Sequence, residues 1–429
     1  MKTSVSLADR ARTAELLAPC GSQAALHAAI RAGANAVYLG LDKLNMRVGA
    51  VRSFSLSDLP DVHRICQEAG VKLYLTLNTI VFENERRQMR AMLDAAAPHI
   101  DAVIASDWAV FEACRRRGIA AHASTQLSCA NSDAAKFLLS QGIRRIVLAR
   151  ECSLHEVSQI EQAIRPLGGE IEVFVHGAQC VAESGRCFLS HFAYGASANR
   201  GVCQQPCRRP FTIIREDDNE GSPRPRAEFA VGAHTILSAR DLCSLPFLDR
   251  ILKAGASSLK IEGRARPPEY VTTVVGAYRK ALDAIRDGIW CKTLADELVE
   301  QCARVYHRRF GLGLFHGRPG ADQFTDNDEN LATRQKRNVG VVEHDYPRAG
   351  FVQIRVQDHA FKIGDTLSIQ GPTTGEVSLS VDSIRHDDLV LSEAVRGDWY
   401  TIPRPVRVRP GDRVYLIRPV PGRHKQDVC

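Results

Sequence analysis

The chain has 429 residues, of which 45% are hydrophobic and 24% charged, and its formal net charge is +7. This is the composition of a globular protein with room for one large and one small domain. It has no apolar run of membrane-spanning length and no signal-peptide pattern, so a membrane span and secretion are not expected and a cytoplasmic location is. In that reducing compartment, the thirteen cysteines are expected to be thiols, ligands or catalytic groups rather than disulfides.

Short apolar, β-branched runs alternate with amphipathic helical stretches along the first 265 residues. The predicted strands are 15–18, 35–40, 71–78, 101–106, 120–125, 144–149, 170–175 and 258–262. Eight such units, without a Gly-rich phosphate loop after the first strand, favour an α/β fold of the (β/α)8 TIM-like barrel type over a doubly wound open sheet. In such a barrel the catalytic residues lie on the loops that follow the strands.

The seventh unit is unusually long, because about 80 residues separate its strand from the eighth. We therefore expect a barrel domain over residues 1–321 that carries a Cys-rich insertion at 176–257. A polar linker is expected at 322–338. Short alternating strands with Gly and Pro turns predict a small C-terminal all-β barrel over 339–419.

Four cysteines of the insertion give the strongest chemical signal. Cys180, Cys187, Cys203 and Cys207 fall within 28 residues, among glycines and arginines. Soft thiolates select an iron–sulfur cluster or zinc, and the wide first pair fits poorly the tight pairs of zinc sites. The spacing favours a cluster over zinc and over structural thiols. Cys243 is a further candidate ligand, although its apolar surroundings predict a core helix.

Polar side chains gather at the ends of the predicted strands, where a barrel places its active site. The candidates for proton transfer are His176, Glu151 and Glu262. The candidates for substrate binding are Asn78, His122, Gln126, Arg150, Lys260 and Arg264, of which the basic ones could bind carboxylate or phosphate. Any one of these residues could have a purely structural role, but polar residues at the ends of several strands together indicate an active site.

Several of these residues stand in motifs that resemble peptidase family U32, the collagenase-like peptidases. The motifs are EVFVHGA at 172–178, SGRC at 184–187, NRG at 199–201 and KIEGR at 260–264. HASTQ at 122–126 and the stretch 197–211, with its fourth cysteine, are similar to the prephenate-dependent RNA hydroxylases of that family. The resemblance covers residues 15 to about 290.

This resemblance implies an enzyme that adds a 5-hydroxyl group to a pyrimidine of tRNA or rRNA without molecular oxygen. It implies a 4Fe-4S cluster on Cys180, Cys187, Cys203 and Cys207, prephenate as co-substrate, and an electron donor as partner. Arg404, Arg407, Arg409 and Arg413 are expected to form part of the RNA-binding surface.

Two alternatives stay open. Another branch of the resembled family hydroxylates ubiquinone precursors, and the family name itself implies a peptidase. The sequence has no HExxH or GxSxG motif that would support proteolysis. Gln179 and Glu183 depart from the residues usual at their positions, which bears on the substrate rather than on the cluster.

Overall fold

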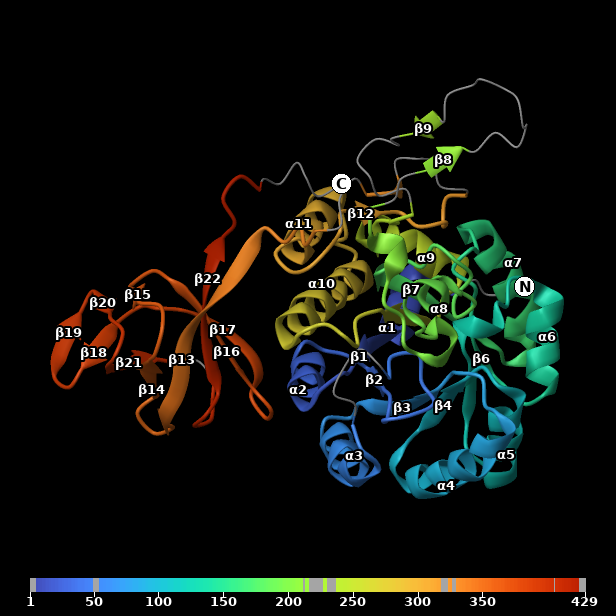
Figure 1. The fold of residues 1–429 in the computed structure, drawn as a ribbon, viewed down its shortest axis with the longest axis horizontal. Coiled ribbons are helices and arrows are strands. Elements are labelled where there is room, and N and C mark those ends of the chain that lie inside the picture. The colour runs from blue at the N-terminus through green and yellow to red at the C-terminus, as the bar shows by residue number, and fades with distance from the viewer. Residues whose placement is uncertain are drawn as a thin grey trace.

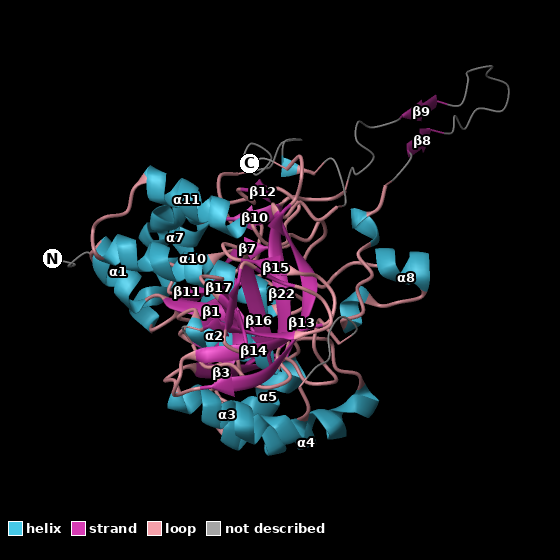
Figure 2. Ribbon diagram, turned by 90° about the vertical axis from the view of Figure 1, so that its left-hand side faces the viewer, coloured by secondary structure: helices cyan, strands magenta, loops and turns pink. Residues whose placement is uncertain are grey.

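The computed structural model describes residues 5–48, 54–210, 213–215, 227–229, 237–317, 323–325, 329–404 and 406–423. Two lobes make up the molecule (Figure 1). One is a parallel barrel wrapped in helices, and the other is an antiparallel sheet that lies beside it. Figure 2 shows the antiparallel lobe in front of the barrel, with helix α8 (Leu189–Tyr194) projecting at the right.

The barrel consists of eight parallel strands that pair in the order β11-β1-β2-β3-β4-β5-β6-β7, and β11 also pairs with β7 to close it. The strands are β1 (Glu15–Pro19), β2 (Ala36–Leu39), β3 (Lys72–Leu77), β4 (Ala102–Ala105), β5 (Ala121–Ala123), β6 (Arg145–Val147), β7 (Glu170–Gly177) and β11 (Ser258–Ile261). The predicted TIM-like barrel is confirmed: six strands lie within the regions expected for them, and β1 and β7 extend one and two residues beyond theirs.

Helices surround the barrel: α2 (Gln23–Arg31), α3 (Leu59–Glu68), α4 (Arg86–Ala96), α5 (Trp108–Arg117), α6 (Ser132–Ser140), α7 (Leu154–Ile164), α9 (Leu248–Ala254), α10 (Pro268–Arg286) and α11 (Lys292–Cys302). Helix α1 (Leu7–Thr13) packs on α9 and α10. Capping residues in the sequence set the ends of several of these helices. Ser22, Asp107 and Asn131 cap the free backbone N–H groups of α2, α5 and α6, and Gly118 ends α5 in the left-handed conformation.

Paired charged side chains lie in the barrel interior. Arg145 pairs with Glu15, which also accepts a hydrogen bond from the Tyr74 hydroxyl at 2.8 Å. Lys260 contacts the fully buried Glu172 at 2.8 Å. These buried charges are tolerated because each has a partner of opposite sign.

The insertion between β7 and β11 folds back onto the barrel. Its strand β10 (Asp241–Cys243) runs antiparallel to the end of β7 and pairs with β12 (Phe310–Gly311). The predicted helix at Cys243 is wrong, because Cys243 pairs with His176 of β7 and is held in an extended conformation. The insertion also contains α8 and the short strands β8 (Ile213–Arg215) and β9 (Ala227–Phe229).

The second lobe is antiparallel, as predicted, and has its own apolar core. Its sheet has the order β17-β16-β22-β13-β14-β21-β18-β19. The strands are β13 (Arg334–Tyr346), β14 (Phe351–Val356), β16 (Thr366–Gly371), β17 (Gly375–Ser380), β18 (Ile384–His386), β19 (Leu389–Leu391), β21 (Trp399–Pro403) and β22 (Arg413–Pro419), with β15 (Phe361–Lys362) and β20 (Glu393–Ala394) paired separately. β13 starts within the expected linker, because its polar first residues pair with β22.

Within the described part of the chain, no helix has both the length and the apolar character needed to cross a membrane.

The Tyr278 hydroxyl joins the insertion to the barrel, and this gives a first test. It donates to the Val175 carbonyl at 2.6 Å and accepts from the Ser244 N–H at 3.0 Å, fully buried. We predict that Tyr278→Phe lowers stability by about 1–3 kcal/mol, because two buried backbone groups lose their partner. Thermal unfolding measures the loss. Tyr346→Phe, which removes an exposed hydroxyl bonded to Gln353, is the matched control; equal melting temperatures of both variants and the parent would contradict the prediction.

Candidate functional site

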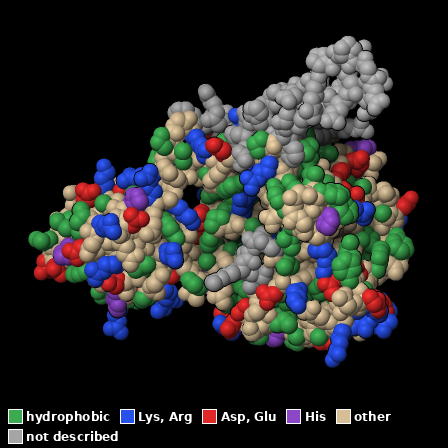
Figure 3. Space-filling model, viewed as in Figure 1, with side chains coloured by type: hydrophobic (Ala, Val, Ile, Leu, Met, Phe, Trp, Pro, Cys, Tyr) green, Lys and Arg blue, Asp and Glu red, His purple; other side chains and the backbone are tan. Residues whose placement is uncertain are grey.

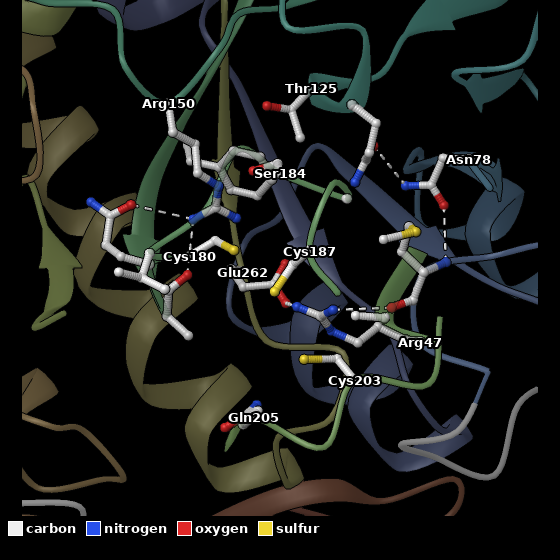
Figure 4. A pocket seen from close by; sticks show the side chains of 18 of the residues that line it. Arg47, Asn78, Thr125, Arg150, Cys180, Ser184, Cys187, Cys203, Gln205 and Glu262 are labelled. Carbon is white, nitrogen blue, oxygen red and sulfur yellow. Dashed lines mark hydrogen bonds and ion pairs between the residues drawn. The ribbon is translucent and has the colours of Figure 1, made fainter. Parts of the chain in front are cut away.

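A cavity opens at the carboxyl ends of the barrel strands. Its walls come from the loops after β2, β3, β5, β6, β7 and β11 and from the cysteine-bearing part of the insertion. Figure 4 shows Cys180, Cys187 and Cys203 around the same space as Arg47 and Glu262. This is the end of the barrel at which the sequence predicted the site.

All four predicted ligand cysteines line this cavity. Cys180 and Cys203 are exposed, Cys187 and Cys207 are half-buried, and none of them forms a disulfide. The pKa of the Cys207 thiol is raised, first by burial and also by the proximity of the other three thiols.

Polar contacts hold the cysteine loops in place. The Asn199 side chain accepts a hydrogen bond from the Cys187 N–H at 2.9 Å, and the Ser190 hydroxyl accepts one from the Gln204 N–H at 3.1 Å. Arg200 contacts Glu85 and stacks on Phe82, 4.7 Å from the ring centroid, which ties this segment to the loop after β3. The thiols therefore sit on a braced loop rather than on a free one.

The donor set fits an iron–sulfur cluster better than a single metal ion. In the described part of the chain, no three His, Cys, Asp or Glu side chains converge on one point as ligands of a single ion do. A cluster spreads its four thiolates around a body several atoms wide, so its ligands need not converge in that way. Four unpaired thiols around one cavity are the ligands such a cluster uses.

Cys243 does not reach the cavity lining. It is 2% exposed, belongs to the apolar core and pairs with His176 at the end of β7. Cys207, by contrast, lines the cavity together with the other three candidate cysteines.

Three guanidinium groups surround the one carboxylate that lines the described part of the cavity. Glu262 accepts a hydrogen bond from Arg47 at 2.7 Å, and Arg150 and Arg264 act on it through space. Burial alone would raise the pKa of Glu262, but the three cations outweigh burial and lower it to about 2. The low pKa keeps Glu262 ionised at neutral pH and makes it a weak base, and its role in proton transfer stays a prediction.

Arg150 and Arg264 have neutral partners. Arg150 donates to the Ala178 carbonyl at 2.9 Å and lies 3.9 Å from the centroid of the Phe174 ring, while its buried Nε has no partner. Arg264 donates to Thr76 at 2.8 Å and to an amide oxygen at 3.2 Å. Burial lowers the pKa of Arg264 to about 10, which leaves it charged at neutral pH. Both groups can therefore receive an anion.

An amide and hydroxyl cluster forms the opposite wall. Asn78 donates to Gln126 at 3.2 Å and to Ser124 at 3.4 Å, and its oxygen accepts from the Met46 N–H at 3.2 Å. Lys260 also lines the cavity, with its ammonium 4.6 Å from the centroid of the Tyr38 ring. The cavity thus brings together Asn78, Gln126, Arg150, Lys260, Glu262 and Arg264 from the predicted set.

The other three predicted residues lie elsewhere. His176 is 2% exposed among the rings of Tyr270, Tyr278 and Phe310, and burial lowers its pKa to about 3. His122 points into the barrel interior against Tyr74, and burial again lowers its pKa to about 3. Glu151 is exposed outside the cavity lining. Neutral, enclosed imidazoles of this kind support structure rather than proton transfer.

Arg47 is the cavity residue that the sequence reasoning missed. It lies in the loop after β2, which carries no strand-end signal, and its Nη1 donates to the Met46 carbonyl at 3.0 Å. The neighbouring Asn45 is buried and bonded to Arg264 at 3.2 Å. The one feature of the sequence that could have indicated this part of the site is the pair of polar residues Asn45 and Arg47 close together in the loop.

The Glu262 charge gives a second test. Its lowered pKa means that its contribution to stability is present above about pH 4.5 and is lost as the pH falls through about 2. We predict that Glu262→Gln flattens the fall in melting temperature over this range and destabilises the protein at pH 7, because Arg47 loses its partner. Glu112→Gln is the matched control, since the pKa of this exposed carboxylate is also lowered to about 2 but surface pairs stabilise little. An acid sensitivity of Glu262→Gln equal to that of the parent would contradict this.

Comparison with known proteins identifies the family of the chain. A model of peptidase family U32 matches residues 21–325. The chain is 38% identical to a collagenase of Porphyromonas gingivalis over 94% of this chain and 97% of that protein. It is 31% identical to tRNA hydroxylation protein P1 of Bacillus subtilis over 87% of each chain. It is 38% identical to the 23S rRNA 5-hydroxycytidine synthase of Escherichia coli over 63% of this chain and 39% of that protein. The chain therefore belongs to peptidase family U32.

Proposed function

We propose that this protein is an RNA-modifying enzyme that hydroxylates C5 of a pyrimidine without molecular oxygen. A 4Fe-4S cluster on Cys180, Cys187, Cys203 and Cys207 is its cofactor, and prephenate is its oxygen donor. The observation that carries the proposal is the convergence of four thiols with Arg150 and Arg264 on one cavity at the carboxyl end of the barrel. The relatives named as tRNA and rRNA hydroxylation proteins support it.

The reaction exchanges hydrogen and hydroxyl between two molecules. The base loses its C5–H bond and gains a C5–OH bond, which is a two-electron oxidation. The donor loses its C–OH bond and gains hydrogen, so it takes up the two electrons. An iron–sulfur cluster supplies one-electron steps or a site for an oxygen ligand. An electron donor is then needed only to bring the cluster to its working oxidation state.

The cavity residues divide into two groups by the chemistry that each can bind. Arg150 and Arg264 bind the two carboxylates of the donor, since their guanidinium groups have no acid partner in direct contact among the described residues. Asn78 and Gln126 present amide groups that suit the edge of a pyrimidine. Glu262 pairs with Arg47 in the same cavity and keeps its guanidinium group oriented. The target base must leave its stack to enter such a cavity.

Proteolysis is the second candidate, because the Porphyromonas gingivalis relative is named a collagenase. The cavity argues against it. Among the described residues, no histidine lines the cavity, its carboxylate Glu262 is held by Arg47, and its Lys260 is paired with Glu172, so its cysteines and serines have no free general base. A ubiquinone precursor is the third candidate substrate, and only product analysis separates it from RNA. Loss of a 5-hydroxypyrimidine from the RNA of a deletion strain supports the proposal; an altered quinone pool with unchanged RNA overturns it.

The cluster is tested by spectroscopy. We predict that protein purified without oxygen absorbs visible light and contains about four iron atoms per chain, as a four-cysteine 4Fe-4S centre does. Replacing any of Cys180, Cys187, Cys203 or Cys207 with Ala abolishes the absorbance and the iron. Cys291→Ala, at an exposed cysteine outside the cavity, keeps both. Stoichiometric zinc, or colourless protein after reconstitution, would refute the cluster.

The proposed prephenate site is tested by substitutions that keep the positive charge of an arginine and remove its planar guanidinium group. Arg150→Lys and Arg264→Lys retain a cation but lose the planar fork that binds a carboxylate through two hydrogen bonds. We predict that each raises the KM for prephenate roughly ten- to hundredfold, as expected for a loss of about 1.5–3 kcal/mol, with an unchanged cluster spectrum. Arg64→Lys on the α3 surface is the control. The KM for prephenate is measured by steady-state kinetics at saturating RNA. A parental KM in both variants would contradict the assignment of Arg150 and Arg264 to the donor site.

A further inference from the structure

A cleft lies between the two lobes, next to the candidate site. It is lined by α10, α11 and the segment after α11 on one side and by β13, β16, β17 and β22 on the other. Figure 3 shows the hollow between the antiparallel lobe on the left and the barrel on the right, with Lys and Arg side chains around it. The loop after β11 joins the two spaces, since Arg264 lines the cavity and Arg266 lines the cleft.

Five arginines form a continuous series from the cavity into the cleft, which we call the arginine track: Arg208, Arg308, Arg266, Arg304 and Arg334. Arg208 lines the cavity beside Cys207, and Arg308 bonds to Gln205 of the same wall at 3.1 Å. The Tyr306 ring then lies under both Arg308, at 5.1 Å, and Arg266, at 3.5 Å. Arg304 and Arg334 continue the series on opposite lobes.

The track lacks paired acids. In the described ranges, none of its five arginines forms an ion pair with a carboxylate; Arg208 bonds to Ser238 at 3.0 Å and to backbone oxygens. Arg308 is 7% exposed, and its Nε and Nη1 have no partner. The cleft carboxylates are engaged elsewhere, Glu269 by Lys336 at 2.6 Å and Glu376 by Ser368 at 2.8 Å.

Gathering these like charges costs free energy. Burial, followed by Arg208 and Arg266 among other neighbours, lowers the pKa of Arg308, although Asp241 acts in the opposite sense. Burial and Arg304 lower the pKa of Arg334. A bound anion would relieve this repulsion, and its charges would have to be repeated along a chain to follow the track.

We propose that the arginine track binds the sugar–phosphate backbone of the RNA strand that flanks the target pyrimidine, with Tyr306 as part of its wall. This inference rests on the proposed function and assigns the RNA path. The strand runs from the cavity, past Arg308 and Arg266, into the cleft between the lobes. The antiparallel lobe then contributes to RNA binding through Arg334 of β13.

This path differs from the surface expected from sequence. Arg404 is 8% exposed and paired with Asp345, and Arg407 lies 3.9 Å from the same carboxylate. Arg413 lies outside the cleft, between α2 and the sheet. Arg404 and Arg407 are thus partly neutralised by Asp345, whereas the arginines of the track pair with no carboxylate in the described part of the chain.

The test measures RNA affinity against salt for the whole anaerobic protein, with a tRNA transcript and a single-stranded oligoribonucleotide as probes. The double variant Arg304→Gln/Arg334→Gln removes two exposed charges from the track. Its slope of log affinity against log salt should be smaller by about 1.4, at roughly 0.7 for each single-strand phosphate contact. The KM for RNA rises, while turnover at saturating RNA and the KM for prephenate stay the same.

Matched variants complete the design. Arg304→Lys/Arg334→Lys keeps the charge and should retain the parental slope, and Arg90→Gln/Arg348→Gln removes two exposed charges elsewhere and should leave binding unchanged. If the Arg304→Gln/Arg334→Gln variant binds and hydroxylates RNA with the parental salt dependence of affinity, the arginine track is overturned and the proposed function stands. No RNA binding or hydroxylation by the parent overturns the proposed function with it. Slower turnover with unchanged RNA affinity overturns the track as an RNA site and assigns it to an acidic electron-donor protein.

Discussion

The pairing of β7 with β11 is the constraint on which the site depends. It closes the barrel and places the loops after the two strands side by side, one carrying the cysteines and the other Glu262 and Arg264. The register shifts between Lys260 and Ile261, and the Glu262 N–H donates to the His176 carbonyl at 2.9 Å. A side chain at Gly177 would collide with the Glu262 carbonyl, so the two loops can approach only with glycine there.

The interior of the barrel and its carboxyl end use charge differently. In the interior, Arg145 and Lys260 each contact a buried carboxylate, so these charges are neutralised and serve stability. At the carboxyl end, the direct partners of Arg150 and Arg264 among the described residues are neutral, and Glu262 is held by Arg47. The positive charge left over at that end is what makes the cavity suited to an anionic ligand.

The cysteine loop is positioned by contacts with distant parts of the chain. Gly201 lies so close to the Asn45 carbonyl that no side chain would fit, and Gly185 packs in the same way on Gln126. The loop after β2 therefore holds two things at once, the cysteine loop through Asn45 and the carboxylate of Glu262 through Arg47. Displacing that loop would disturb the thiols and the anion-binding groups together, which couples the proposed cluster site to the donor site.

The sequence alone determined the barrel and much of the site, because strand periodicity locates strand ends and parallel strands bring those ends to one rim. Arg150 and Arg264 followed from that rule, and the four cysteines followed from their close spacing in the insertion. Only the tertiary structure decided which side chains at a strand end face the cavity. His176 turns outward beside a register shift, and Arg47 enters from a loop without periodicity. The direction of a side chain past the last paired residue depends on contacts across the barrel, and such contacts leave no periodic pattern in the sequence.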